Sequence, residues 1–391
     1  MGNQARADSS AGNVVTFDDA PEPGFINFGV GQPSADLLSV ELLNDASERF
    51  FADAQPFDFN YGSTQGDPRY LAAVSDFLGS EYGQPVSASD LLLTGGNSQA
   101  LDFVCNRFTQ PGDTVFVEDP SYFLAFQILR DHGLNVVGMP IDDDGLIVED
   151  LEPALKTHRP SLVYTIPSYH NPTGRTMSKA RRERLVALSK EYDFVIAADE
   201  VYQLLYFGDP PPPAMGTYAG EGNVLSLGSF SKILAPAMRL GWIQTDEHHM
   251  ERLLASGMIN SGGSFSHFSS HLVRNLIEAD RLAGFVRQLR TTFRARVDAM
   301  DRALQEHVGG RARWIVPQGG YFFWLELTSD TDAEQLRQHA GEFQTGFQPG
   351  PLFSPESKRL DRFIRLSFAH YTEPDIEEGV ARIGRLLDRY G

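Results

Sequence analysis

Short apolar runs alternate with helical patterns between about residues 90 and 245. One of the helical stretches is Ser178–Tyr192, in which Leu185, Val186 and Leu188 lie on one side. The apolar runs are rich in Val, Ile, Leu and Phe, as in strands buried on both faces. They are Asp113–Glu118, Leu134–Ile141, Leu162–Ile166, Phe194–Ala198, Val224–Leu227 and Leu240–Gln244. This alternation predicts a parallel, doubly wound α/β sheet.

The C-terminal third has a different pattern, which predicts an α+β unit with more antiparallel character. An amphipathic helical region runs from about residue 267 to Val308, and the chain ends in a helix over Pro374–Tyr390. Between them lie the apolar runs Arg313–Val316, Tyr321–Leu327 and Phe363–Phe368. We therefore expect an N-terminal arm and part of a small domain over 1–44, a large domain over 45–265, and the rest of the small domain over 266–391.

Composition narrows the possible partners and compartments. The net charge of −19 disfavours nucleic acid and anionic membranes as partners. Cys105 is the only cysteine, so no internal disulfide can form and a cytoplasmic protein is expected. No apolar run is long enough for a transmembrane helix. The polar, acidic segment Met1–Ala20 lacks the apolar centre of a signal peptide, and we expect a loose arm there.

The first candidate for chemistry is the segment Gly228–Lys232, which follows an apolar strand and precedes Arg239 by seven residues. Taken alone, Lys232 reads equally well as a solvated loop lysine. Asp199 ends the apolar strand Phe194–Ala198, where an unpaired carboxylate is costly. The protonated pyridine nitrogen of a pyridoxal cofactor would pair with this carboxylate. The alternative interpretation is that Asp199 only caps a helix.

Two turns add further polar groups. Asn171 precedes Pro172, so its side-chain amide is held as a rigid hydrogen-bond donor. With Tyr202 it could bind the phenolic oxygen of a pyridine cofactor. Taken alone, an Asn-Pro sequence indicates only a turn. The glycine-rich turn Thr94–Gln99 enters a helix near Ala100, which is an arrangement that suits an anion. It matches neither the nucleotide P-loop nor the dinucleotide fingerprint, so NAD and ATP are disfavoured.

Taken together and in order, these segments resemble the fold-type I pyridoxal-phosphate (PLP) enzymes of the class I/II aminotransferase family. The likeness is greatest to the subgroup of 2-aminoadipate and broad-specificity aromatic aminotransferases, and it runs from Asn27 to the final helix. The motifs are the glycine-rich turn, Asp119-Pro120-Ser121-Tyr122, Asn171-Pro172-Thr173-Gly174, Asp199-x-x-Tyr202, Ser229-x-Ser231-Lys232 with Arg239, and Arg365. The resemblance implies an aspartate aminotransferase-like fold, with a mostly parallel seven-stranded sheet and a small α+β domain.

The resemblance also implies roles for individual residues. Lys232 would form a Schiff base with PLP and move the substrate proton, and Asp199 would hold the pyridine nitrogen. Tyr122 would stack on the ring, while Asn171 and Tyr202 would bind its phenolic oxygen. The implied phosphate ligands are Gly96, Asn97, Ser98, Ser229 and Arg239, with Ser231 as a further candidate.

For the substrate, Arg365 would bind the α-carboxylate through its planar fork, aided by Asn171 and Gly31. Tyr61 resembles a tyrosine that reaches the phosphate of the neighbouring subunit, which implies a homodimer with shared sites. The apolar residues Val14, Val15 and Phe17 of the arm could help to cover that interface.

Two departures from the family pattern affect these expectations. The 2-aminoadipate relatives carry an N-terminal helix with a substrate-binding arginine, whereas this chain has a polar arm with Pro and Gly. That specificity is therefore not transferred. The phosphate turn reads Gly96-Asn97-Ser98 where relatives often have Gly-Ser-Gln, so the backbone contacts can persist while the side-chain contacts change.

Other site types receive less support. His267 and His271 are four residues apart on one helix face, but no HExxH glutamate or third ligand accompanies them, so no metal is expected. His267 could instead lie at the substrate pocket. No Gly-x-Ser-x-Gly elbow of a serine hydrolase is present.

The sequence thus predicts a PLP-dependent aminotransferase that moves an amino group between an L-amino acid and a 2-oxo acid by a ping-pong mechanism. Other PLP chemistries remain open alternatives, namely a β- or γ-lyase, a cyclopropane-forming synthase or an amino-acid oxidase. A non-enzymatic, aminotransferase-like regulator is disfavoured, because only about 25 residues precede the first family-like segment and the charge is negative.

Overall fold

The computed structural model describes residues 24–356 and 360–391. The expected N-terminal arm, including Val14, Val15 and Phe17, lies outside the described residues. None of the described helices is long and apolar enough to cross a membrane.

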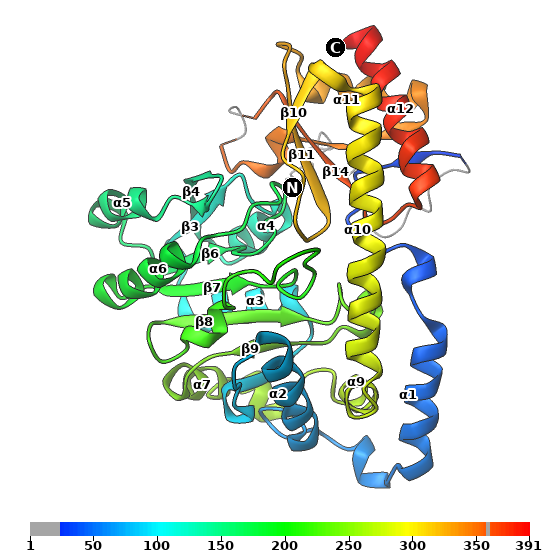
Figure 1. The fold of residues 1–391 in the computed structure, drawn as a ribbon. Coiled ribbons are helices and arrows are strands. Elements are labelled where there is room, and N and C mark those ends of the chain that lie inside the picture. Colours follow the sequence, from blue (N-terminus) through cyan, green and yellow to red (C-terminus); the bar gives the residue numbers. More distant parts are fainter. Residues whose placement is uncertain (1–23, 357–359) are drawn as a thin grey trace, which may run out of the picture.

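The larger sheet has eight strands in the order β2-β9-β8-β7-β6-β3-β4-β5 (Figure 1). Strands β8, β7, β6, β3 and β4 are parallel, while β9 runs antiparallel to both of its neighbours and β5 antiparallel to β4. The bounds are Leu91–Thr94 (β2), Thr114–Asp119 (β3), Asn135–Asp142 (β4), Gly145–Leu146 (β5), Leu162–Thr165 (β6), Val195–Asp199 (β7), Val224–Ser229 (β8) and Gly241–Gln244 (β9). The predicted mostly parallel sheet is confirmed, and the two-residue β5 adds an eighth strand at its edge.

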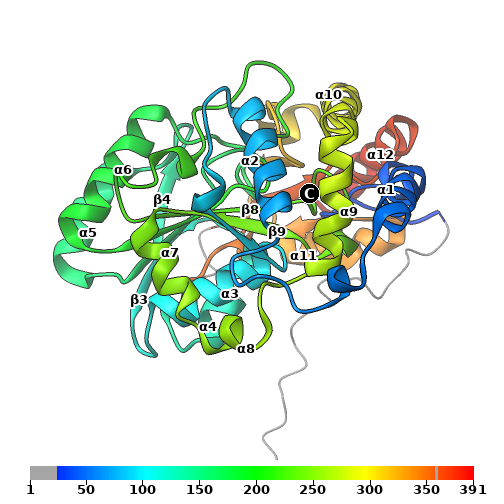
Figure 2. The same ribbon diagram turned by 90° about the horizontal axis from the view of Figure 1, so that it is seen from below.

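Helices cover both faces of this sheet (Figure 2). Val115 and Val117 of β3 enter one apolar cluster and the intervening Phe116 enters the other, as the two-residue period of a strand requires. Helices α3 (Asn97–Phe108) and α4 (Phe123–Asp131) contribute to the first cluster. Helices α5 (Leu151–His158) and α6 (Lys179–Tyr192) contribute to the second. Five of the six apolar runs are thus strands buried from both sides, whereas β4, whose outer neighbour is the two-residue β5, is only partly buried.

The smaller sheet is antiparallel, with the order β10-β11-β14-β13. Its strands are Ala312–Trp314 (β10), Phe322–Leu327 (β11), Gln348–Pro349 (β13) and Phe363–Ser367 (β14). Helix α12 (Glu373–Tyr390) packs against α10 (Arg281–His307) and α11 (Ala333–Ala340) beside it. A separate parallel pair joins β1 (Ile26–Asn27) to β12 (Thr345–Gly346). This pairing brings the N-terminal segment beside the C-terminal third.

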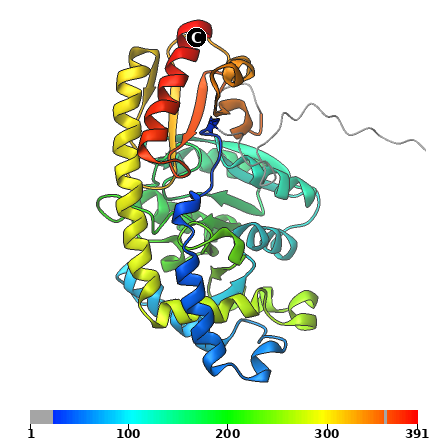
Figure 3. The same ribbon diagram turned by 90° about the vertical axis from the view of Figure 1, so that its right-hand side faces the viewer.

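Helix α10 is the longest element and runs from the region of the smaller sheet to that of α9 (Figures 1 and 3). The sequence predicted one helical region from about residue 267, but the structure divides it into α9 (His267–Glu278) and α10. The break falls at Asp280, whose φ is +53°. Asp tolerates this left-handed conformation better than most residues, and an α-helix cannot continue through it.

The remaining helices pack around these elements. They are α1 (Val40–Asp53), α2 (Pro68–Tyr82), α7 (Glu247–Leu254) and α8 (Gly257–Gly262). Both α1 and α2 pack against α9. Side chains start several of these helices: the Ser39 hydroxyl accepts a hydrogen bond at the start of α1, and the Asp67 carboxylate does so before Pro68 of α2. The domain boundaries expected at residues 44/45 and 265/266 stay a prediction.

Candidate active site

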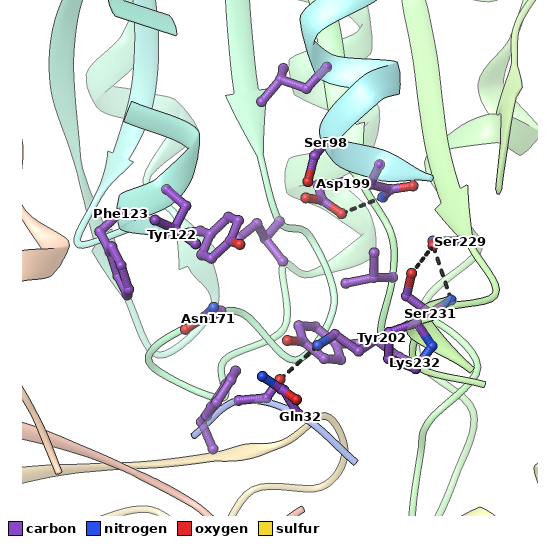
Figure 4. Close-up of a pocket in the computed structure, with 18 of the residues that line it drawn as sticks. Gln32, Ser98, Tyr122, Phe123, Asn171, Asp199, Tyr202, Ser229, Ser231 and Lys232 are labelled. Carbon is purple, nitrogen blue, oxygen red and sulfur yellow. Dashed lines mark hydrogen bonds between the residues drawn. The ribbon is translucent and has the colours of Figure 1, made fainter. Parts of the chain in front are cut away.

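One pocket gathers most of the predicted residues at the carboxyl ends of the parallel strands, where open α/β sheets bind ligands. Figure 4 shows Asp199 and Ser98 at one end, Tyr122 and Asn171 along one side, and Lys232 with Ser229 and Ser231 along the other. The lining residues are Gly29, Gly31, Gln32, Asn97, Ser98, Leu101, Tyr122, Phe123, Leu124, Ile128, Tyr164, Ile166, Asn171, Asp199, Val201, Tyr202, Ser229, Ser231, Lys232, Pro236, Arg239, Phe322, Gln348 and Arg365.

Lys232 lies just beyond β8 and reaches across the pocket toward the N-terminal segment. Its Nζ donates a hydrogen bond of 2.7 Å to the carbonyl oxygen of Gly31 and lies 5.1 Å from the ring centre of Tyr321. Burial lowers the pKa of Lys232 to about 8; the nearby charge of Arg365 adds to this and Asp199 opposes it. The side chain is therefore poised to exchange a proton near neutral pH, which suits an amine that acts as nucleophile and base.

Asp199 ends β7 and is 8% exposed. Its Oδ1 accepts a hydrogen bond of 2.7 Å from Asn97 Nδ2, and its Oδ2 accepts one of 2.9 Å from the Tyr164 hydroxyl. Burial raises the pKa of Asp199, and the two hydrogen bonds act in the opposite direction. Both donors are neutral, so a cation in the pocket would complete the pairing of this carboxylate.

The start of α3 is a glycine-rich turn whose geometry suits an anion. Gly96 precedes the helix with φ +86° and no side chain caps the first helical N–H groups. A Cβ at Gly96 would lie 3.0 Å from Nη2 of Arg239, which donates to the carbonyl oxygen of Gly95. Free N–H groups, a helix N-terminus and a guanidinium therefore lie together.

Hydroxyl groups complete this end of the pocket. The Ser229 hydroxyl donates to that of Ser231 over 3.0 Å and accepts from the Ser231 N–H over 3.1 Å. This local turn orients both side chains beside Lys232, and Ser98 contributes its side chain from the first turn of α3.

Arg365 lies at the opposite end, on β14. Its Nη1 donates to Asn171 Oδ1 over 3.0 Å and its Nη2 donates to the Gly29 carbonyl oxygen over 2.8 Å. The guanidinium lies 4.1 Å from the ring centre of Phe322. Burial lowers the pKa of Arg365 to about 10, so it stays a cation at neutral pH. Within the described chain no carboxylate forms an ion pair with it, and its Nε has no hydrogen-bond partner.

Two tyrosines frame the space between these groups. Burial raises the pKa of Tyr122 to about 12, so its hydroxyl stays protonated. Tyr202 packs with its ring centre 5.4 Å from that of Tyr321, whose hydroxyl donates to the carbonyl oxygen of Lys232. The backbone that carries Lys232 is thus fixed by the same aromatic cluster that forms the pocket wall.

Some candidate residues lie elsewhere. Tyr61 is 78% exposed and does not line the pocket of its own chain. His267 and His271 touch through their Nε2 atoms at 3.3 Å, and His271 stacks on Phe50. Neither histidine lines the pocket, and the described residues contain no group of three or more His, Cys, Asp or Glu side chains suited to a metal.

Several pocket residues were not predicted from the sequence. Tyr164 is one of two side-chain hydrogen-bond donors to Asp199. Its place inside a fully buried strand next to β7 could have indicated that its hydroxyl needs a partner there. Gln32 and Gln348 add amides to the pocket, and Phe123, Leu124, Ile128 and Phe322 form apolar wall. Nothing in the local sequence marked these residues, because the folded chain brings them together from distant segments.

Comparison with known proteins bears on this arrangement. A sequence profile of the family described as aminotransferase class I and II matches residues 23–383. The chain belongs to this family. As a class I/II aminotransferase it is an enzyme of the transaminase type, and the fold-type I resemblance is confirmed.

Individual relatives confirm the predicted subgroup, that of the aromatic-amino-acid and 2-aminoadipate aminotransferases. An aromatic-amino-acid aminotransferase of Thermococcus litoralis is 31% identical over 93% of this chain and 88% of its own length. The structure of the alpha-aminoadipate aminotransferase of Thermus thermophilus, complexed with N-(5'-phosphopyridoxyl)-L-leucine, superimposes with a TM-score of 0.85 at 31% identity, covering 94% of this chain and 93% of that one. An uncharacterised helix-turn-helix-type transcriptional regulator of Bacillus subtilis is 28% identical over 93% of this chain and 74% of the regulator.

Proposed function

We propose that this aminotransferase holds PLP on Lys232 and transfers the amino group of an L-amino acid with an uncharged, bulky side chain to a 2-oxo acid. The observation that carries the proposal is the convergence of Lys232 Nζ, the buried carboxylate of Asp199, and the guanidinium groups of Arg239 and Arg365 in one pocket. Among the described residues neither arginine has a carboxylate partner. Arg365 is buried, where an unpaired cation is costly, and Arg239 lies beside the N-terminus of α3, which favours an anion. Two anionic ligand groups therefore fit this donor set.

The residues present suit PLP. Arg239 and the first N–H groups of α3 would hold its phosphate, together with the hydroxyl groups of Ser98, Ser229 and Ser231. Asp199 would pair with the ring nitrogen, Tyr122 would cover one ring face, and Asn171 and Tyr202 would hold the phenolic oxygen. When bound, PLP supplies an electron sink that makes the proton on the substrate Cα easier to remove.

The protein itself would orient the substrate and move its proton. Arg365 would bind the α-carboxylate by a two-pronged contact, with Asn171 and the backbone at Gly31 beside it. A Cβ at Gly31 would lie 3.3 Å from Phe322 and 3.9 Å from Arg365 Nη2, so glycine keeps this approach open. Lys232 Nζ would then take the proton from Cα, and its lowered pKa supports that role at neutral pH.

The proposed substrate class rests on the rest of the pocket. Its remaining walls are largely apolar, with Phe123, Leu124, Ile128 and Phe322 beside the amides of Gln32 and Gln348. The described lining residues include three cations, Lys232, Arg239 and Arg365, and each already has a role. A second carboxylate on the substrate side chain would therefore meet no described cation of this chain, whereas an aromatic or branched side chain would bury apolar surface.

A panel of amino acids in half-reactions with the PLP-loaded enzyme, without an added 2-oxo acid, tests this proposal. We expect kcat/KM for Phe and Leu to exceed that for 2-aminoadipate by about tenfold or more, since an unpartnered charge costs at least 1–3 kcal/mol to bury. A preference for 2-aminoadipate would overturn the substrate class and leave the transaminase assignment intact.

We also propose a homodimer in which each subunit lends Tyr61 to the site of the other. The proposal is supported by the position of Tyr61, which is exposed and does not line the pocket of its own chain. Exposed aromatic side chains on the same segment and on α9 support it as well. These side chains are Phe51, Phe57, Phe59 and Phe268, which are 60%, 77%, 57% and 45% exposed. Ring contacts link Phe51, Phe59 and Phe268 into one surface that a second copy would cover.

A further inference from the structure

The carboxylate of Asp199 is held at both of its oxygens by side chains from two other elements. Asn97 is the first residue of α3, and Tyr164 lies in β6, next to β7 in the sheet. The hydrogen bonds to Oδ1 and Oδ2 are 2.7 and 2.9 Å long. Because the donors approach from two elements, the carboxylate has a fixed direction as well as a fixed position.

Each of the two donors is itself held by its surroundings. Asn97 Nδ2 also donates to the Leu227 carbonyl oxygen of β8 over 2.8 Å, and Tyr164 is fully buried. An amide nitrogen carries two hydrogens, and Asp199 and Leu227 take both of them. The Asn97 amide nitrogen therefore has no hydrogen left for a phosphate, and only the backbone N–H of Asn97 remains for that contact.

Both donors also favour the ionised carboxylate. Burial raises the pKa of Asp199, whereas the hydrogen bonds from Asn97 and Tyr164 lower it. Removing a donor would leave a buried carboxylate oxygen unsatisfied, and the group would then compete more strongly for the proton of any cation facing it.

We propose that Asn97 and Tyr164 are positioning residues that keep the Asp199 carboxylate ionised and aimed at the ring nitrogen of bound PLP. This inference rests on the proposed function, since it requires PLP as the cofactor. It assigns the Asn97 side chain to the ring-nitrogen end of the site. The phosphate is left to the backbone N–H groups of α3, to Arg239, and to the hydroxyl groups of Ser98, Ser229 and Ser231.

The test compares two cofactors that differ only at the ring nitrogen. PLP and 1-deazapyridoxal 5'-phosphate, in which carbon replaces that nitrogen, are titrated into apoenzyme of the wild type and of Tyr164→Phe and Asn97→Leu. We expect each substitution to weaken PLP binding about tenfold, because a carboxyl group that keeps its own proton more readily pairs less well with a protonated ring nitrogen, and to change analogue binding less than about twofold.

Two matched controls define the alternatives. Tyr70→Phe removes another fully buried tyrosine hydroxyl, which has no hydrogen-bond partner among the described residues and lies outside the pocket. Both ligands should keep their affinity for this variant. Ser98→Ala should weaken PLP and the analogue equally, since both carry the phosphate. Melting temperatures of the apo variants report whether each still folds, and Tyr164→Phe carries the test should Asn97→Leu unfold.

The outcomes separate the inference from the proposed function. Equal loss of affinity for PLP and the analogue in both variants would overturn the positioning role and indicate a phosphate or packing role. Unchanged PLP affinity in both variants would also overturn it, while tight PLP binding by the wild type would leave the proposed function standing. A wild type that binds neither ligand would overturn the proposed function itself.

Discussion

At the residue scale, the environment of Lys232 gives a pH signature. Its amine is neutral above a pKa of about 8, and only the neutral form attacks a carbonyl. Capture of PLP by the apoenzyme, trapped with borohydride, should therefore speed up about tenfold per pH unit below 8 and level off above it. Peptide mapping should find the label on Lys232, and Lys232→Ala should show none. A rate that continues to rise up to pH 10 would contradict the lowered pKa.

Arg365 allows a second prediction at this scale. Replacing it by Lys keeps the positive charge but removes the fork that contacts Asn171 and Gly29. We expect the KM for amino acids to rise about 10- to 100-fold, with PLP affinity almost unchanged. Arg362→Lys is the control, because Arg362 is an exposed arginine of the same region that pairs with Glu326. Equal damage to PLP and substrate affinity would refute the assignment of Arg365 to the substrate.

Some features of these residues could be predicted from the sequence and others could not. The lysine, the aspartate at a strand end and the two turns lie at fixed places relative to the strands, so their pattern predicts one common site. The partners of Asp199 were not predictable in the same way. Whether the Asn97 side chain turns toward a phosphate or toward Asp199 depends on the position of α3 over β7 and β8, and that position is a product of tertiary packing.

At the scale of elements, the turn into α3 gives a testable backbone requirement. Gly96→Ala would place a methyl group 3.0 Å from Arg239 Nη2 at a φ of +86°. We expect PLP affinity to fall at least tenfold, since the cation would be displaced from the helix N-terminus. Binding titrations of the apoenzyme measure this effect.

Gly83→Ala is a matched control for the turn. Gly83 ends α2 with φ +67°, and no atom of the described residues lies within 4 Å of an added Cβ. The substitution should lower the free energy of unfolding by about 1 kcal/mol, as left-handed positions require, without changing PLP affinity. If both variants lost PLP affinity alike, backbone strain rather than the Arg239 contact would be responsible.

The elements themselves were largely predictable. All six apolar runs of the larger sheet are strands, and the five that are buried on both faces have the largely unbroken apolar sequence that such burial requires. The short strands β1, β5, β12 and β13 have only two residues each, too few for any periodicity. The break at Asp280 was missed because amphipathic periodicity continues on both sides of it.

At the scale of the whole molecule, the proposed homodimer makes a prediction about mixed subunits. A Tyr61→Phe chain is mixed with a Lys232→Ala chain, and activity is followed at limiting PLP. If the sites are shared, both defects fall in one site of the mixed dimer and the other site is intact. Activity should then exceed that of either parent. No regained activity despite proven subunit exchange, or an active monomer in sedimentation, would refute sharing.

The pairing of β1 with β12 has a consequence for synthesis of the chain. Arg365 is fixed by the carbonyl oxygen of Gly29, 336 positions earlier, and Lys232 meets Gly31 from the same early segment. During translation the early segment can therefore pair with β12 only after almost the whole chain has been synthesised. A nascent chain on the ribosome can form the larger sheet, with Lys232 beside it, long before Arg365 has been synthesised. Binding of the proposed cofactor can therefore precede binding of a substrate.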